Sequence, residues 1–123
     1  FGDLLWWSKA GYGVVISPCK ATTRDEMKAA GTAAITSHVT NMGSKDVKVS
    51  EPTEREGKIY VTAAGHLDWE GKMRAYAATA VIFEAGGNYF ELFSLSKSEE
   101  SKQREADIAS IVAAIKPAKD SDK

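Results

Sequence analysis

The sequence predicts an α+β domain in which a mainly antiparallel sheet of four to five strands is flanked by two long helices. The segment from Glu56 to Ser96 reads as three long strands in succession. Two short glycine turns, Glu70-Gly71 and Gly86-Gly87, join these strands and make them antiparallel neighbours. An amphipathic stretch near each end of the chain indicates a helix. The expected order is strand, helix, four strands and helix.

The first strand and the first helix follow from local composition. Val14, Val15 and Ile16 form a β-branched run that is typical of a strand covered on both faces, and Pro18 ends it. The spacing from Thr23 to Glu26 matches a capping box, and apolar residues then recur at helical spacing. We therefore expect a helix over 23–43, with Gly43 at its C-terminal end.

The later elements are read in the same way. A short alternating strand over 46–50 precedes a charged loop over 51–57, and longer strands cover 59–69, 73–83 and 89–95. Small and apolar residues occur on both faces of the middle strands, so both faces should be covered. The last helix is expected over 98–116, ended by Pro117. We expect these core residues: Val14, Ile16, Ile35, Val39, Val61, Val81, Phe93, Ile108, Ile111 and Ile115.

The bulk composition is that of one globular domain. A length of 123 residues predicts a single domain over 1–117 with a polar tail over 118–123. The net charge of −1 gives no general attraction to nucleic acid, and the apolar runs are too short for a transmembrane segment. The chain starts at Phe1, so we expect a removed leader and export to a periplasmic, extracellular or lumenal space, with a cytoplasmic location as the alternative.

Motifs for catalysis and for metal binding are weak. His66 precedes Asp68 by two residues on one strand face, which could orient an imidazole, although a surface histidine is the commoner case. Cys19, the single cysteine, stands beside Lys20, and a buried structural thiol is again the commoner case. The two histidines and one cysteine are far apart in sequence, so we expect no metal and no cofactor.

Aromatic residues give the better candidates for a binding site. Trp6 and Trp7 are adjacent, so an extended chain would place them on opposite faces and leave one of them partly exposed. Trp69 stands at a hairpin tip, beside Glu70-Gly71. Exposed tryptophans commonly anchor protein contacts. We therefore take Trp6, Trp7 and Trp69, together with His66, as candidate partner-binding residues.

The chain resembles the Mog1/PsbP-like group. The resemblance is carried by Trp7-x-x-x-x-Tyr12-Gly13-Val14-x-Ile16-x-x-Pro18, by the following helix, by the hairpins at Gly71 and Gly87, and by the closing Ile108-x-x-Ile111-Val112-x-x-Ile115-Lys116-Pro117. That group has a central antiparallel sheet flanked by helices. It includes photosystem II extrinsic subunits, a nuclear-transport adaptor, exported bacterial lipoproteins and secretion-associated chaperones. The resemblance implies a domain that binds other proteins and catalyses nothing.

Three functions remain open from the sequence. We expect a non-catalytic module for protein binding, assembly or chaperoning, which needs another protein as its partner. The alternative is a carrier of a small ligand or lipid in a cleft over the alanine-rich strands, which contain Ala63, Ala64, Gly65, Ala75, Ala77, Ala78 and Ala80. A hydrolase built on His66 or Cys19 is the third and weakest interpretation.

Overall fold

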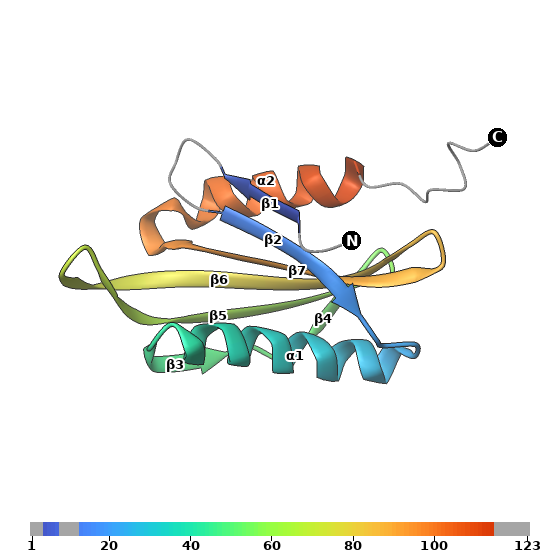
Figure 1. Cartoon of the computed structure of the whole chain (residues 1–123), viewed down its shortest axis with the longest axis horizontal. Helices are drawn as coiled ribbons and strands as arrows, with labels where there is room; N and C mark the ends of the chain where they lie inside the picture. Colours follow the sequence, from blue (N-terminus) through green and yellow to red (C-terminus); the bar gives the residue numbers. More distant parts are fainter. Residues whose placement is uncertain (1–3, 8–12, 115–123) are drawn as a thin grey trace.

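The computed structural model describes residues 4–7 and 13–114. Within these ranges only the backbone is described for residues 4–7, Trp69 and Ala114. These residues form one sheet with a helix on each face (Figure 1). In chain order the elements are β1 (Leu4–Trp7), β2 (Gly13–Cys19), α1 (Arg24–Asn41), β3 (Lys45–Val49), β4 (Thr53–Arg55), β5 (Lys58–Trp69), β6 (Lys72–Ala85), β7 (Asn88–Lys97), the 3-10 turn η1 (Ser98–Glu100) and α2 (Ser101–Ala114).

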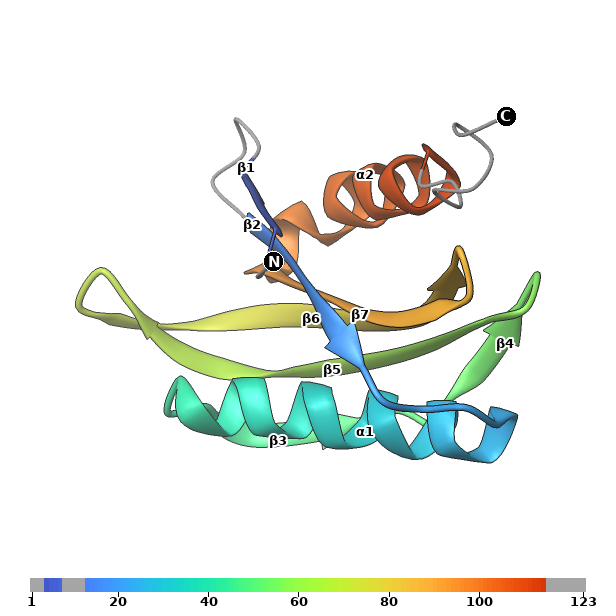
Figure 2. The same ribbon diagram turned by 45° about the vertical axis from the view of Figure 1, so that its right-hand side comes forward.

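The sheet is antiparallel at every pairing between the described strands. Its order is β1-β2-β7-β6-β5-β3, and β4 pairs with β5 further along the same edge. Figure 2 shows α1 and α2 on opposite sides of this sheet. The predicted α+β class, the order of the long strands and the two helices are therefore confirmed.

The strand count is where the sequence prediction is wrong. We expected four to five strands, and the described residues form seven. The segment of β1 lacks a regular alternation, and β4 lies within the stretch read as a charged loop. Glu56-Gly57, with φ of 53° and 80°, closes the β4–β5 hairpin in the same left-handed conformation as Glu70-Gly71, with φ of 57° and 83°.

Both helices lie within the expected ranges and are shorter than expected. Thr23 caps α1, since its hydroxyl oxygen accepts a hydrogen bond from the Glu26 amide at 3.1 Å. The Glu26 carboxylate accepts from the amide and the hydroxyl of Thr22, and these bonds lower the pKa of that carboxyl. In the last helix, residues 98–100 form a 3-10 turn before α2. Residues 115 and 116 lie outside the described part of the chain.

The two sides of β5 differ sharply in exposure. The residues that face α1 are all buried: Ile59, Val61, Ala63, Gly65 and Leu67. On the other side Tyr60 is half-buried against the α2 cluster, and the residues that follow it are exposed: Thr62, Ala64, His66 and Asp68. The alternation was predicted correctly, whereas the expected cover on both faces is wrong for the part of this strand from Thr62 onward. The reason is that α2 lies chiefly over β6 and β7 and reaches β5 only near Tyr60.

Two apolar clusters make up the core, one on each face of the sheet. The cluster under α1 joins Ile35 and Val39 to residues of β5, β6 and β7. The cluster under α2 joins Ile108 and Val112 to residues of β2, β6 and β7. Gly31 lets α1 approach closely, since a Cβ there would lie 2.9 Å from Val61 Cγ2.

Most of the expected core residues are buried in the structure. They are Val14, Ile35, Val39, Val61, Val81, Phe93 and Ile108. The prediction that Ile16 and Ile111 are buried is wrong, because both are half-buried at the edge of the α2 cluster. The helix turns Ile108 toward the centre of the cluster and Ile111 toward its rim. Ile115 lies outside the described residues.

We expect Ile108→Ala to lower the free energy of unfolding by about 2–5 kcal/mol, because Ile108 has 0% of its surface exposed and its truncation leaves a cavity. Ile111→Ala is the matched control and should cost clearly less. Urea titration of both variants measures this. An equal loss for the two variants would contradict the described docking of α2.

Candidate functional site

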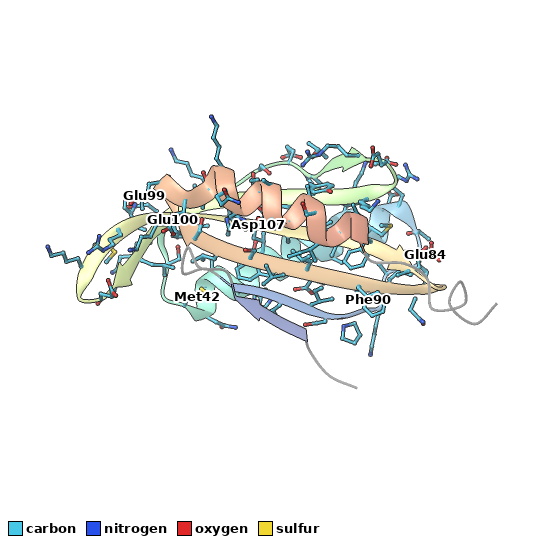
Figure 3. All side chains as sticks on the ribbon, turned by 90° about the horizontal axis from the view of Figure 1, so that it is seen from above. Met42, Glu84, Phe90, Glu99, Glu100 and Asp107 are labelled. Atoms are coloured by element: carbon cyan, nitrogen blue, oxygen red, sulfur yellow. The ribbon has the colours of Figure 1, made fainter. Side chains whose placement is uncertain are left out.

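A strip of the sheet surface beside α2 is left uncovered. We call it the open strip and define it by these exposed residues: Thr62, Ala64, His66 and Asp68 of β5, with Met73 and Ala75 of β6. The register places His66 opposite Ala75 and Asp68 opposite Met73, so the strip is continuous across the two strands. Met73 has 52% of its surface exposed, which is high for a large apolar side chain. Figure 3 shows this face of the molecule, with α2 nearest the viewer.

The open strip continues into a hollow against the first turns of α2. This hollow has a volume of about 440 Å³. Its floor is made of small residues of β5 and β6, its outer wall is the β3 edge, and its inner wall is α2. The lining residues are Lys48, Val49, Ser50, Thr62, Ala63, Ala64, Ala77, Ala78, Ser101, Arg104 and Glu105.

A second hollow lies further along the same helix. It has a volume of about 420 Å³ and is bounded by the β4–β5 hairpin. Its lining residues are Arg55, Glu56, Lys58, Tyr60, Ala109, Val112 and Ala113. Tyr60 and Thr62 are successive residues on one face of β5, and the α2 residues of the two hollows recur at helical spacing. The two hollows therefore lie in line along one flank of α2, and we call them together the groove.

A buried arginine is fixed where the groove meets the sheet. Arg104 has 1% of its surface exposed. Its Nε donates to Ser96 Oγ at 3.0 Å, and its Nη1 donates to Thr79 Oγ1 at 2.9 Å and to the Ser94 carbonyl at 3.5 Å. These bonds hold the guanidinium in one orientation, because they engage both its Nε and its Nη1.

The Glu105 carboxylate is the anionic partner in this network. Its Oε2 accepts a hydrogen bond from the Thr79 hydroxyl and lies 3.4 Å from Arg104 Nη2. The Glu105 side chain is 40% exposed, so the pair joins a buried cation to a carboxylate at the groove surface. The distance is longer than the usual 2.7–2.9 Å of a strong charge-assisted bond, so the direct ion pair is weak.

The far half of the groove is also charged. The Arg55 guanidinium carbon lies 3.9 Å from the centre of the Tyr60 ring, within the range of a cation–π contact. Burial raises the pKa of the Tyr60 phenol above its ordinary value. The Arg55 charge opposes this rise, while Glu56 and Glu105 add to it. Glu105 therefore acts electrostatically on both halves of the groove.

A larger hollow exists on the outer side of α1. It has a volume of about 740 Å³, and it is lined by small and polar residues of α1 and by Pro52. Lys28 is its one titratable lining residue among those described. A stripe of small residues alone gives no chemistry to recognise a partner. The groove, with its fixed arginine, is the better candidate site.

His66 is exposed and lies on the open strip. Its Nδ1 is 3.7 Å from Asp46 Oδ2 on β3, so the carboxylate that it contacts is not Asp68, which the sequence had offered as the less common alternative to a surface histidine. Asp46 reaches this place because it lies at an irregularity of β3, between the paired residues Lys45 and Lys48, with a φ of 57°. Both side chains are well exposed, so the contact is weak.

The three tryptophans are placed by their backbone alone. Trp6 and Trp7 lie in β1, opposite Val14 and Gly13, and Trp69 ends β5 opposite Lys72. The predicted exposure of their side chains lies outside the described residues. Trp69 nevertheless belongs to the hairpin that carries the open strip.

The residues of a hydrolase site do not converge. Cys19 lies opposite Tyr89, which lies opposite Glu84 of β6, whereas His66 lies opposite Ala75 of the same strand. At the rise of an extended strand these positions are roughly 30 Å apart. Among the described residues no three histidine, cysteine or acidic side chains gather into a candidate metal site.

Arg104 and Glu105 were not singled out from the sequence. A signal was present, because Arg104 stands four residues before Ile108 on the apolar stripe of α2. A charged residue at a stripe position must find buried partners, so it could have marked the site. The partners themselves, on β6 and β7, follow from the tertiary structure.

Comparison of the chain with models of known protein families finds no match, and a search of curated proteins likewise finds none. None of the helices within the described part of the chain has the length and apolar character needed to cross a membrane.

We expect Arg104→Met to lower the free energy of unfolding by about 1–3 kcal/mol, because the buried hydroxyls of Thr79 and Ser96 lose their donor. Arg104→Lys should not restore stability, since an ammonium group cannot reach three partners in one plane. Urea titration measures both variants. Arg104→Lys at wild-type stability would contradict the role assigned to the planar fork.

Proposed function

We propose that this domain is a non-catalytic binding module for another protein, and that the open strip and the groove form its contact surface. The proposal is carried by one observation. On its α2-facing side β5 exposes Thr62, Ala64, His66 and Asp68, while the central residues of β6 and β7 on that face are buried. An uncovered sheet face next to a groove offers a flat, already ordered surface that a partner can cover at little conformational cost.

Further features of the same surface support protein binding. Met73 is an exposed apolar side chain on the strip, and methionine adapts its shape to different contacts. His66 adds a polar contact at the centre of the strip. The resemblance to the Mog1/PsbP-like group also implies binding of other proteins.

The second candidate function is a carrier of a small ligand. The observation in its favour is the hollow of about 440 Å³ over Ala64 and Ala77, which lies over the alanine-rich strands, as that alternative requires. The hollow is open on the side of the strip and is bordered by Lys48, Arg104 and Glu105. Such a border suits a partner that remains partly in water better than an enclosed lipid.

We expect a photoreactive benzoyl-phenylalanine at position 64 to cross-link one discrete partner in extracts of the source cells. The same probe at position 33 should give no such product. Ala33 is the matched control, because it is also an exposed alanine but lies on the outer face of α1. Unlabelled wild-type protein should compete for the product, and unlabelled Ala64→Arg protein should not.

Equal cross-linking from both positions, or competition by Ala64→Arg as strong as by wild type, would contradict the proposed surface. The thermal midpoint of Ala64→Arg should stay near that of wild type, since the added side chain points into solvent. This control separates loss of binding from loss of folding.

Native mass spectrometry of the protein from its own source tests the carrier. If the domain binds a protein, the isolated chain should appear at its unliganded mass after gentle desalting. A stoichiometric small ligand that is retained by wild type and lost in Ala77→Phe would favour the carrier instead, because the larger ring would fill the hollow over β6.

A further inference from the structure

We infer that the groove binds an extended, acidic segment of the partner protein, and that Glu105 occupies the place that a carboxylate of this segment takes. This inference rests on the proposed function and specifies the chemistry of the partner. It is drawn from three features of the groove, namely its charge, its dimensions and the weakness of the Arg104–Glu105 contact.

The groove is locally positive in a chain whose net charge is −1. Lys48 stands at one end, Arg55 and Lys58 stand at the other, and Arg104 lies between them. The lining carboxylates among the described residues are Glu56 and Glu105. Cations at both ends of the groove favour an anionic partner, because they attract it during its approach and can pair with its carboxylates once it is bound.

The dimensions fit a short extended peptide. From Ser101 to Ala113 the α2 wall is about 18 Å long, at the helical rise of 1.5 Å per residue. An extended peptide covers this length with about five residues, at roughly 3.3 Å each. The floor carries alanines and Thr62, so a peptide can lie close to β5 without displacing large side chains.

The Arg104 guanidinium is already oriented for a carboxylate. Ser96 and Thr79 fix its Nε and Nη1 edges, which leaves Nη2 on the side of Glu105. A group held in advance loses little freedom when a ligand binds, so its hydrogen bond contributes more to affinity. Glu105 is the neighbouring residue on the same helix and is 40% exposed, so its carboxylate can turn outward when another carboxylate takes its place and accepts from the Thr79 hydroxyl instead.

Glu105 also explains how the buried charge of Arg104 is tolerated before an acidic segment binds. A buried cation with no nearby anion is costly, and the Glu105 carboxylate reduces this cost in the free protein. The same carboxylate then competes with the incoming segment. Its removal should therefore strengthen the binding of an acidic peptide, whereas removal of an ordinary contact residue would weaken binding.

The other occupants of such a groove fit less well. An acyl chain has no charge to match Lys48, Arg55 and Lys58 along the length of the groove. A second copy of this chain would have to present an acidic extended segment of its own. These occupants are outcomes of the experiment below.

The test is a titration of ¹⁵N-labelled protein with Ac-Glu-Ala-Glu-Ala-Glu-NH₂, followed by amide chemical shifts in low salt. Its counterpart Ac-Lys-Ala-Lys-Ala-Lys-NH₂ has the same length and the opposite charge. We expect the acidic peptide to shift the amides of Thr62, Ala64 and Ala109. The basic peptide should leave them in place. Added salt should weaken the binding of the acidic peptide, since the charges of Lys48 and Arg55 are exposed and salt screens them.

Three variants make the test specific. Lys48→Glu combined with Lys58→Glu should weaken the acidic peptide at least about tenfold, which is ~1.4 kcal/mol. Lys28→Glu has the same chemistry on the outer face of α1 and should leave the affinity within about twofold of wild type. Glu105→Gln should lower the dissociation constant of the acidic peptide about threefold or more. The basic peptide should still leave the groove amides unshifted in this variant.

Equal shifts with both peptides, shifts confined to other surfaces, or weaker binding by Glu105→Gln would overturn the inference. Dodecanoate that shifts the groove amides while the acidic peptide does not would assign the groove to an acyl chain. The cross-linking at position 64 separates the two proposals. A protein cross-linked there through a segment without acidic residues would leave the proposed function standing and reject this inference.

Discussion

The width of a helix relative to a strand is the constraint on which this structure depends. A helix with its side chains is about 10 Å wide, and neighbouring strands are about 4.8 Å apart, so one helix covers roughly two strands. The sheet is six strands across, in the order β1-β2-β7-β6-β5-β3. One helix on each face cannot cover it. Helix α1 contacts chiefly β5 and β6, whereas α2 contacts chiefly β7 and β6. This offset leaves β5 buried on one side and, from Thr62 onward, open on the other.

The two helices meet the sheet in different ways, and the difference creates the groove. Helix α1 lies close to β5, because Gly31 removes the side chain that would meet Val61. Helix α2 is apolar under Ile108 and Val112, but its first turns rest on Arg104 and on the hydroxyls of Thr79 and Ser96. Replacing such a buried charged network with well-packed apolar residues is often neutral or stabilising. Stability alone therefore does not account for an arginine at this position.

Much of the fold follows from the sequence, because the long strands and helices have strong periodic patterns. The alternation from Ile59 to Leu67 and the cap at Thr23 each predict their element correctly. Strands β1 and β4 were missed because short segments have too few residues to show a period, although Glu56-Gly57 repeats the turn at Glu70-Gly71. The groove could not be predicted, since it depends on where α2 crosses the sheet. That crossing is decided by packing between residues far apart in sequence, such as Ile108 and Val81.

Arg104 and Glu105 connect the packing of α2 to the chemistry of the groove. The arginine satisfies two buried hydroxyls, and so it helps to fix the start of α2 over β6 and β7. Its remaining edge is held by a half-exposed carboxylate through a contact of 3.4 Å, which is too long to be strong. The interactions that position the helix are thus buried, while the one beside the groove is weak and accessible. A ligand carboxylate that replaced Glu105 would leave the bonds from Arg104 to Ser96 and Thr79 in place, and it would accept the hydrogen bond that the Thr79 hydroxyl donates to Glu105 in the free protein.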